Sequence, residues 1–122
     1  MNNILAVFIG GGLGSLARYG ISIALIGRIK ASFPVSTFCS NILSCFILAI
    51  TVFVLADKTT MNPLLKFFIV TGFCGGFSTF STFSFETVEL FRSGDVFYAL
   101  LNILISLIAG IAIIYFFAKN IQ

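Results

Sequence analysis

The chain has 122 residues, of which 59% are hydrophobic and only 9% charged, and its formal net charge is +3. A soluble domain is roughly 45–50% apolar and about 25% charged, so this composition excludes a soluble globular protein and indicates an integral membrane protein. The basic excess is shared among short loops, which favours ordinary lipid-facing ends over nucleic-acid binding.

Four apolar stretches are long enough to cross a membrane, which takes about 20 residues at a rise of 1.5 Å per residue. The predicted spans are residues 4–26, 34–56, 64–91 and 96–118, and together they make residues 1–122 a single transmembrane domain. The first span lacks the basic leader and the small-residue cleavage site of a signal peptide, so we expect it to stay in the protein. The predicted fold class is therefore all-α, integral and multi-pass.

The first two spans each carry a strongly polar residue at membrane depth. Arg18 lies in "GGGLGSLARY", residues 10–19. An ionisable residue there is a functional hypothesis by default; we expect a salt bridge to Glu86 or Glu89, with a place at a pore vestibule as the alternative. Asn41 is the one amide in the middle of the second span. Its NH₂ group offers two donors to an anion, and a hydrogen bond between helices accounts for it equally well.

The third span contains "GFCGGFSTFSTFSFE", residues 72–86, in which three glycines precede five hydroxyl side chains. Irregular backbone at membrane depth is tolerated only where it is buried in protein or lines a wet cavity. Because glycine permits unusual backbone angles, we expect two half-helices with a break near residues 75–78, the second capped by Ser78 or Thr79. Close helix packing through small residues is the alternative.

After the break, phenylalanine recurs every third residue, with serine and threonine between. Phe80 and Phe83 would lie on one helical face, about 4.5 Å apart along the axis. Aromatic rings have positive edges, so they can attract an anion without a formal charge. A stripe of phenylalanine that is only core is the alternative. Glu86, which ends the run, is expected to cap a pore mouth or to satisfy donors there.

The fourth span has one polar pair, Asn102 and Ser106, which are four residues apart and so share a helical face. They predict either an extension of a polar track or a hydrogen bond between helices. The three cysteines lack a C-x-x-C spacing and the chain has no histidine, so neither a disulfide framework nor a metal site of these residues is predicted.

Short loops between four spans place both termini on one side of the membrane. Lys58 and Lys119, with Lys66 close by, lie on that side, and Arg28, Lys30 and Arg92 lie on the other. Orientation follows the side with more basic residues. This near balance is typical of a protein that inserts both ways, from which an antiparallel homodimer could follow. A weakly biased protein fixed by its first helix is the alternative.

Three segments of the chain resemble the Fluc fluoride channels, also called CrcB proteins. They are "GGGLGSLARY", "STFCSNILSCF" and, above all, "GFCGGFSTFSTFSFE", which is similar to the family signature G-x-x-GG-(S/T)-T-F-S-T-F. The resemblance covers all four spans. It implies a dual-topology antiparallel homodimer in the bacterial inner membrane, with two fluoride pores and a central structural sodium ion.

The resemblance also implies roles for particular residues. The fluoride pore would be formed by Asn41, Phe80, Phe83, Ser81, Thr82 and Ser106. The carbonyl groups of Gly75 and Ser78 would hold the sodium ion, Arg18 would lie near the vestibule, and Glu86 would be the carboxylate that ends the signature. The chain has Ser78 where many members have threonine, and Gly110 where some have a second polar residue, which leaves the inner part of the track open.

The function predicted is passive, selective conduction of fluoride out of the cell, without enzymatic activity. A small four-helix, proton-coupled multidrug exporter is one alternative, but that mechanism needs a carboxylate in the middle of the first span, and the sequence has none there. A membrane scaffold that transports nothing is another, and it would leave the stripe of hydroxyl groups without a purpose.

Overall fold

The computed structural model of the protein describes residues 1–55 and 61–121, which contain helices and no strand. The four ranges long and apolar enough to span a membrane are Asn3–Leu25, Val35–Leu55, Pro63–Arg92 and Val96–Asn120. They agree with the predicted spans to within two residues at each boundary that is described. The predicted end of the second span, at Ala56, and the loop residue Lys58 lie outside the described residues.

The first two spans are helices with different starts. Helix α1 (Asn3–Leu25) begins where the Asn2 side chain accepts a hydrogen bond from the Leu5 amide at 2.9 Å, a standard N-cap. Helix α2 (Val35–Ala49) follows directly after Pro34 and continues as the π-helical segment η1 (Ile50–Leu55).

The third span is built from several helical segments. Pro63 occupies the first turn of α4 (Pro63–Lys66), capped by the Asn62 side chain. The chain continues through η2 (Phe67–Cys74) and α5 (Gly75–Phe77), and α6 (Phe80–Arg92) resumes after two residues. The last span is the single helix α7 (Val96–Asn120).

Two residues between α5 and α6 have extended backbone: Ser78 (φ −79°, ψ 159°) and Thr79 (φ −153°, ψ 119°). Thr79 is the N-cap of α6, since its side chain accepts from the Thr82 amide at 3.2 Å. The expectation that glycine backbone angles cause the irregularity is wrong, because Gly75 has ordinary helical angles (φ −63°, ψ −37°). Extended angles at a serine and a capping threonine are what separate α5 from α6.

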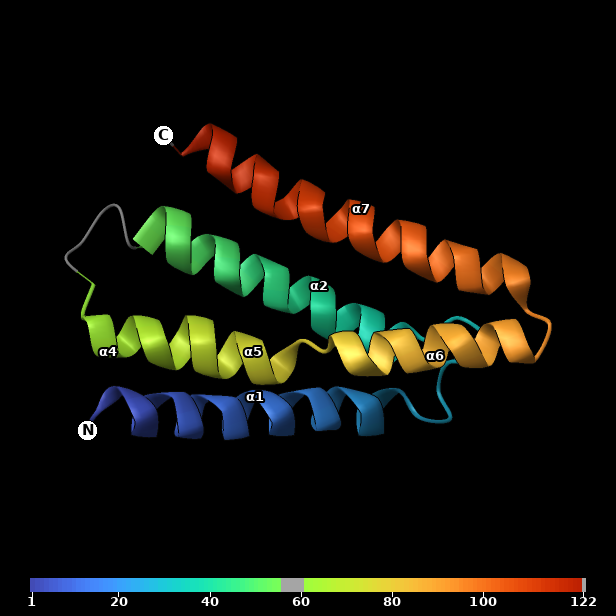
Figure 1. Ribbon diagram of the computed structural model, residues 1–122, viewed down its shortest axis with the longest axis horizontal. Coiled ribbons are helices and arrows are strands. Elements are labelled where there is room, and N and C mark those ends of the chain that lie inside the picture. The colour runs from blue at the N-terminus through green and yellow to red at the C-terminus, as the bar shows by residue number, and fades with distance from the viewer. Residues whose placement is uncertain (56–60, 122) are drawn as a thin grey trace.

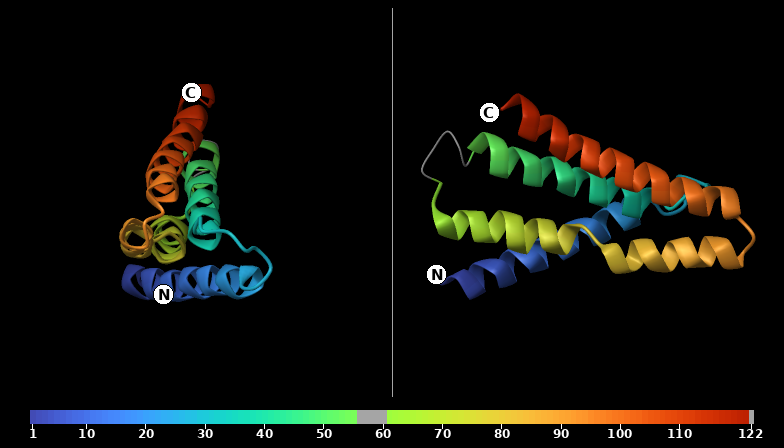
Figure 2. Two further views of the ribbon diagram at one scale, coloured as in Figure 1. Left: turned by 90° about the vertical axis from the view of Figure 1, so that its right-hand side faces the viewer. Right: turned by 45° about the horizontal axis from the view of Figure 1, so that its top comes forward.

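The most extensive contacts between spans are those of α1 with η2 and α5 and of α2 with α7, and α1 also contacts α2 while α6 contacts α7 (Figure 1). The start of α1 and the end of α7 lie at the same end of the molecule, and α6 is offset from the line of α4 to α5 (Figure 2). Four spans with short connections account for this arrangement, and it brings the start of α6 next to α2 and α7.

Close approach of α1 to the third span depends on glycine. A Cβ atom on Gly14 would collide with the carbonyl oxygen of Phe73, and one on Gly76 with that of Gly11. A Cβ on Gly72 would lie 2.9 Å from the Val7 carbonyl oxygen. Small residues let membrane helices approach this closely, so the packing explanation holds for Gly72 and Gly76. Gly75 differs: it is exposed, and a Cβ there would meet nothing described within 4 Å.

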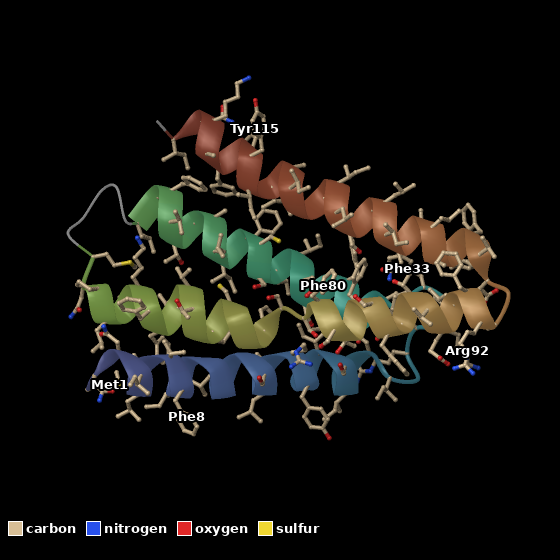
Figure 3. The ribbon with its side chains drawn as sticks, viewed as in Figure 1. Met1, Phe8, Phe33, Phe80, Arg92 and Tyr115 are labelled. Atoms are coloured by element: carbon tan, nitrogen blue, oxygen red, sulfur yellow. The ribbon has the colours of Figure 1, made fainter. Side chains whose placement is uncertain are left out.

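Most buried side chains are small or polar, whereas most exposed ones are large and apolar. Ser40, Asn102 and Thr51 are buried, as are the alanines 6, 49 and 99. Large side chains such as Phe8 and Tyr115 are exposed and project outward (Figure 3). Lipid solvates apolar side chains, so polar groups are the ones that gather between helices. This distribution is the one expected of a membrane protein.

Candidate functional site

A pocket of about 230 Å³ lies where α6 begins, between α2 and α7. Four of the residues predicted to form the pore line it together: Asn41 from α2, Phe80 and Phe83 from α6, and Ser106 from α7. Phe80 lies at the first turn of α6, directly after the two extended residues (Figure 3). Three spans therefore contribute to one hollow beside the interruption of the third.

Asn41 holds the interruption in place. Its side-chain Oδ1 accepts a hydrogen bond from the Thr79 amide at 2.7 Å, and its Nδ2 donates to the Thr79 carbonyl at 3.3 Å. Extended backbone at membrane depth needs such partners, because lipid offers none. The explanation by a hydrogen bond between spans is thus realised. In the part of the chain that the structure describes, the amide keeps one of its two N–H groups for a ligand.

The carbonyl group of Cys74, which lies before the interruption, accepts three hydrogen bonds. It accepts hydrogen bonds from Ser78 Oγ at 2.8 Å, the Ser78 amide at 3.0 Å and Ser44 Oγ at 3.1 Å. The residues on either side of α5 are therefore tied to α2, Cys74 through Ser44 and Thr79 through Asn41. Ser78, which also lines the pocket, gives its hydroxyl hydrogen to this carbonyl group.

The two carbonyl groups predicted to hold a cation have lost their helical partners. In a continuous helix the Thr79 amide would donate to the Gly75 carbonyl, but it donates to Asn41 instead. The Thr82 amide would donate to the Ser78 carbonyl, but it donates to Thr79 Oγ1. Both carbonyl oxygens are thereby released from the helical pattern. Main-chain carbonyls freed in this way are the usual cation ligands of interrupted membrane helices.

No cluster of three or more His, Cys, Asp or Glu side chains that could hold a metal occurs within residues 1–55 and 61–121. The donors that fit a cation in this region are therefore backbone oxygens. A hard, singly charged cation such as sodium suits oxygen ligands of this kind. Carbonyl oxygens are the ligand type that a sodium ion requires, and the ion itself stays a prediction.

Phe80 and Phe83 form the predicted aromatic pair. Their ring centroids are 6.0 Å apart, and the ring planes are tilted by 37°. Phe83 is partly buried, whereas Phe80 is 78% exposed. Phe77, the preceding aromatic residue in the period of three, is buried against α1. The stripe thus divides into a core residue and two residues at the pocket.

Ser81 and Thr82, predicted as neighbouring pore hydroxyls, do not line the pocket. Their hydroxyl oxygens lie 3.3 Å and 3.2 Å from Thr79 Oγ1, and Thr79 does line it. Ser81 and Thr82 thus contact the pocket-lining Thr79 without lining the pocket themselves. Sequence reasoning gave Thr79 only a capping role and missed Cys45 as a lining residue. The spacing was a usable signal for Cys45, which follows Asn41 by four residues and shares its helical face.

The two polar residues of α7 have different surroundings. Ser106 lines the pocket, whereas Asn102 is 1% exposed and donates from Nδ2 to Thr87 Oγ1 at 2.9 Å. The Ser106 hydroxyl donates to Asn102 Oδ1 at 3.3 Å. Further along the helix, a Cβ on Gly110 would lie 3.3 Å from Cys45 Sγ, so a polar side chain there would press on the pocket wall.

Arg18 does not form the expected salt bridge, and that prediction is wrong. Its Nε donates to the Gly76 carbonyl at 3.2 Å, because α1 packs along α5 and not along the acidic part of α6. Glu86 accepts from Thr37 Oγ1 at 2.8 Å, and Glu89 pairs with Arg92 at 2.8 Å. Glu86 and Glu89 also line a second hollow near the end of α6.

The chain was also compared with known proteins. The sequence profile of the CrcB-like protein, Camphor Resistance (CrcB), matches residues 5–117. A protein of Azobacteroides pseudotrichonymphae genomovar. CFP2, named fluoride-specific ion channel FluC, is 44% identical over 113 residues, which cover 92% of this chain and 90% of the relative. Relatives of the same name occur in Serratia proteamaculans (42% identical; 88% and 84% covered) and in Flavobacterium psychrophilum (37% identical; 91% and 90% covered).

Proposed function

Because the chain belongs to the CrcB family, we propose that it is a fluoride-specific ion channel which lets fluoride leave the cell passively. Hydrogen fluoride crosses membranes from acid surroundings and dissociates inside, so a path for the anion down its gradient would protect the cell. The observation that carries the proposal is the pocket that joins Asn41, Phe80, Phe83 and Ser106 beside the interrupted third span.

The pocket suits a small, strongly hydrated anion. Fluoride gives up its water only if several donors replace it, and it leaves again only if none holds it too firmly. The free N–H of Asn41 and the edges of two phenylalanine rings are modest donors of this kind, and the Ser106 hydroxyl can join them by giving up its 3.3 Å hydrogen bond to Asn102 Oδ1. No formal positive charge lines this pocket, so exit of the anion is not opposed by an ion pair.

A sodium ion, bound by the carbonyl groups of Gly75 and Ser78, is part of the proposal. The Gly75 carbonyl lacks its helical partner because the Thr79 amide donates to Asn41 Oδ1 instead. The Ser78 carbonyl lacks its partner because the Thr82 amide donates to Thr79 Oγ1. The ion would supply positive charge to the interrupted backbone and so stabilise it. The carbonyl groups of this chain would orient and hold it.

The functional unit we propose is an antiparallel homodimer with two pores. The exposed Gly75, beside which no described atom would meet a Cβ within 4 Å, supports close approach of a second subunit there. The exposed Phe80 would also gain a neighbour. Insertion in both orientations is favoured by the near balance of basic residues at the two ends, and the bacterial inner membrane is the proposed location.

The proton-coupled exporter is less well supported. Such a mechanism needs a carboxylate within the first span, and α1 has none. Its charged residue, Arg18, is engaged with the Gly76 carbonyl.

Fluoride efflux from proteoliposomes tests the proposal. Vesicles loaded with potassium fluoride are opened to potassium by an ionophore, and released fluoride is read with a fluoride-selective electrode. The expected result is rapid release that depends on the protein, with chloride-loaded vesicles releasing little. Chloride release as fast as that of fluoride would overturn the proposal.

A further inference from the structure

A buried amide connects the wall of the pocket to the core of the subunit. Asn102 is 1% exposed and lies between α6 and α7. Its Nδ2 donates to Thr87 Oγ1 at 2.9 Å, and its Oδ1 accepts from the Ser106 hydroxyl at 3.3 Å. Ser106 lines the pocket, but Asn102 does not. Asn102 can therefore act on a bound anion only through Ser106.

The direction of every hydrogen bond in this network is set by one carbonyl group. The Phe83 carbonyl can only accept, and the Thr87 hydroxyl donates to it at 2.7 Å. A hydroxyl has one hydrogen, so the Thr87 oxygen can only accept from the amide. Nδ2 must then face Thr87, which leaves Oδ1 to face Ser106.

The Ser106 hydroxyl consequently gives its hydrogen to Asn102 and not to the pocket. Its oxygen lone pairs are what remain toward the cavity, and these repel an anion. Fluoride that reaches Ser106 has to draw the hydroxyl round and break the bond to Asn102. A neutral hydrogen bond of this kind is broken readily by a charged competitor.

We infer that Asn102 is a positioning residue of the pore, which competes with fluoride for the hydrogen of Ser106 and so weakens fluoride binding there. The inference rests on the proposed function, because it assigns a means of release to the same pathway. A conducting site needs such weakening, since an anion held by all donors at once would not leave. Asn102 provides it without entering the pocket.

A purely structural role for Asn102 predicts a different result. If the amide only joined α6 to α7, its loss would loosen the pocket and lower fluoride flux whether or not Ser106 has a hydroxyl. The competition predicts tighter fluoride binding when the amide is removed, and only while the Ser106 hydroxyl is present.

The experiment compares Asn102→Leu, Ser106→Ala and the double variant in proteoliposomes, measuring fluoride flux against fluoride concentration. Loss of a competing hydrogen bond should lower the half-saturating fluoride concentration of Asn102→Leu by about fivefold, with a maximal flux no higher than that of the unmodified protein. In the Ser106→Ala background the same change should leave that concentration unaltered. An unchanged or raised concentration, or a shift that persists without the Ser106 hydroxyl, would overturn the inference.

A second variant decides the matter if Asn102→Leu does not fold. Thr87→Val frees the amide to turn its Nδ2 toward Ser106, which releases the hydroxyl hydrogen, so the half-saturating concentration should again fall. Thr51→Val is the matched control, because Thr51 is also buried and also donates to the carbonyl four residues earlier at 2.7 Å, but lies away from the pocket. Equal behaviour of the two valine variants would reject the inference.

Failure of the inference can be told from failure of the proposed function. If the unmodified protein carries no fluoride, both are overturned. If it carries fluoride selectively while the Asn102 and Thr87 variants leave the half-saturating concentration unchanged, only the inference is.

Discussion

The side-chain amide of Asn41 pairs with both backbone groups of Thr79, accepting from its N–H at 2.7 Å and donating to its C=O at 3.3 Å. The amide oxygen thus stands in for the Gly75 carbonyl, which is the helical partner that the Thr79 N–H has lost. The Thr79 carbonyl, as that of an N-cap residue, accepts from Nδ2 in addition to the first hydrogen bond of α6. One residue of the second span thereby satisfies the break in the third and lines the pocket beside it. The stability of the break and the proposed conduction of fluoride therefore depend on the same side chain. Substitutions of Asn41 can distinguish its effect on stability from its effect on flux.

Replacing Asn41 by alanine should both destabilise the protein and abolish fluoride flux. The variant leaves the N–H of Thr79 without a partner, at a cost of about 1–3 kcal/mol for a buried group. Thermal unfolding in detergent and fluoride efflux measure the two effects. Asn41→Asp still accepts from the Thr79 amide but offers no donor and repels an anion, so it should lose flux with a smaller loss of stability. Flux at the unmodified rate in Asn41→Asp would contradict a pore role for this residue.

Phe80→Leu should slow fluoride efflux by about tenfold, equivalent to about 1.4 kcal/mol, because leucine has no positively polarised ring edge. The subunit should fold normally, since Phe80 is 78% exposed. Phe85→Leu is the matched control: Phe85 is 66% exposed on the same helix and does not line the pocket. Equal efflux from the two variants, measured with the fluoride electrode, would show that Phe80 is no more than a lipid-facing residue.

Gly76→Ala should destabilise the folded chain, whereas Gly75→Ala should leave its stability unchanged. The new Cβ on Gly76 would collide with the Gly11 backbone, and overpacking of this kind costs about 1–3 kcal/mol or more. Gly75→Ala meets nothing within 4 Å in the described subunit, so its helical content and thermal stability as a monomer should be unchanged. Its effect should appear in dimer formation, measured by size exclusion or by crosslinking. A fully dimeric, conducting Gly75→Ala would argue against close approach of a second subunit at this position.

Exchange of sodium for a bulky organic cation should abolish conduction or dissociate the dimer. The proposed ligands are the carbonyl oxygens of Gly75 and Ser78, and a bulky organic cation offers them no compact positive charge to coordinate. Fluoride efflux and dimer mass, followed after dialysis into N-methyl-D-glucamine, are the measurements. As the control, fluoride efflux and dimer mass should both return when sodium is added back. If neither changes on the exchange, the proposed sodium site is rejected.

Much of the site could be predicted from the sequence because its signals are local. Phe80 and Phe83 are one helical turn apart, so their shared face and ring contact follow from helical geometry. Asn41 was expected either to donate to an anion or to form a hydrogen bond between helices. In the structure it bonds to Thr79 of the third span, and one of its two N–H groups remains available for an anion. Two predictions failed. The glycines do not carry the irregular backbone angles, and the partner of Arg18 depends on which helix lies beside α1, which is information that spacing along the chain does not contain.

The sequence by itself determined the class of this protein, its four spans and the polar and aromatic residues of the third. Hydrophobic length and helical period are properties of contiguous residues, and the membrane acts on each span separately. Only the tertiary structure decided that Ser78 and Thr79, and not the glycines, carry the extended backbone, that Asn41 pairs with Thr79, and that Asn102 turns the Ser106 hydroxyl away from the pocket. Each of these depends on the direction of hydrogen bonds between spans, which packing sets when the helices meet.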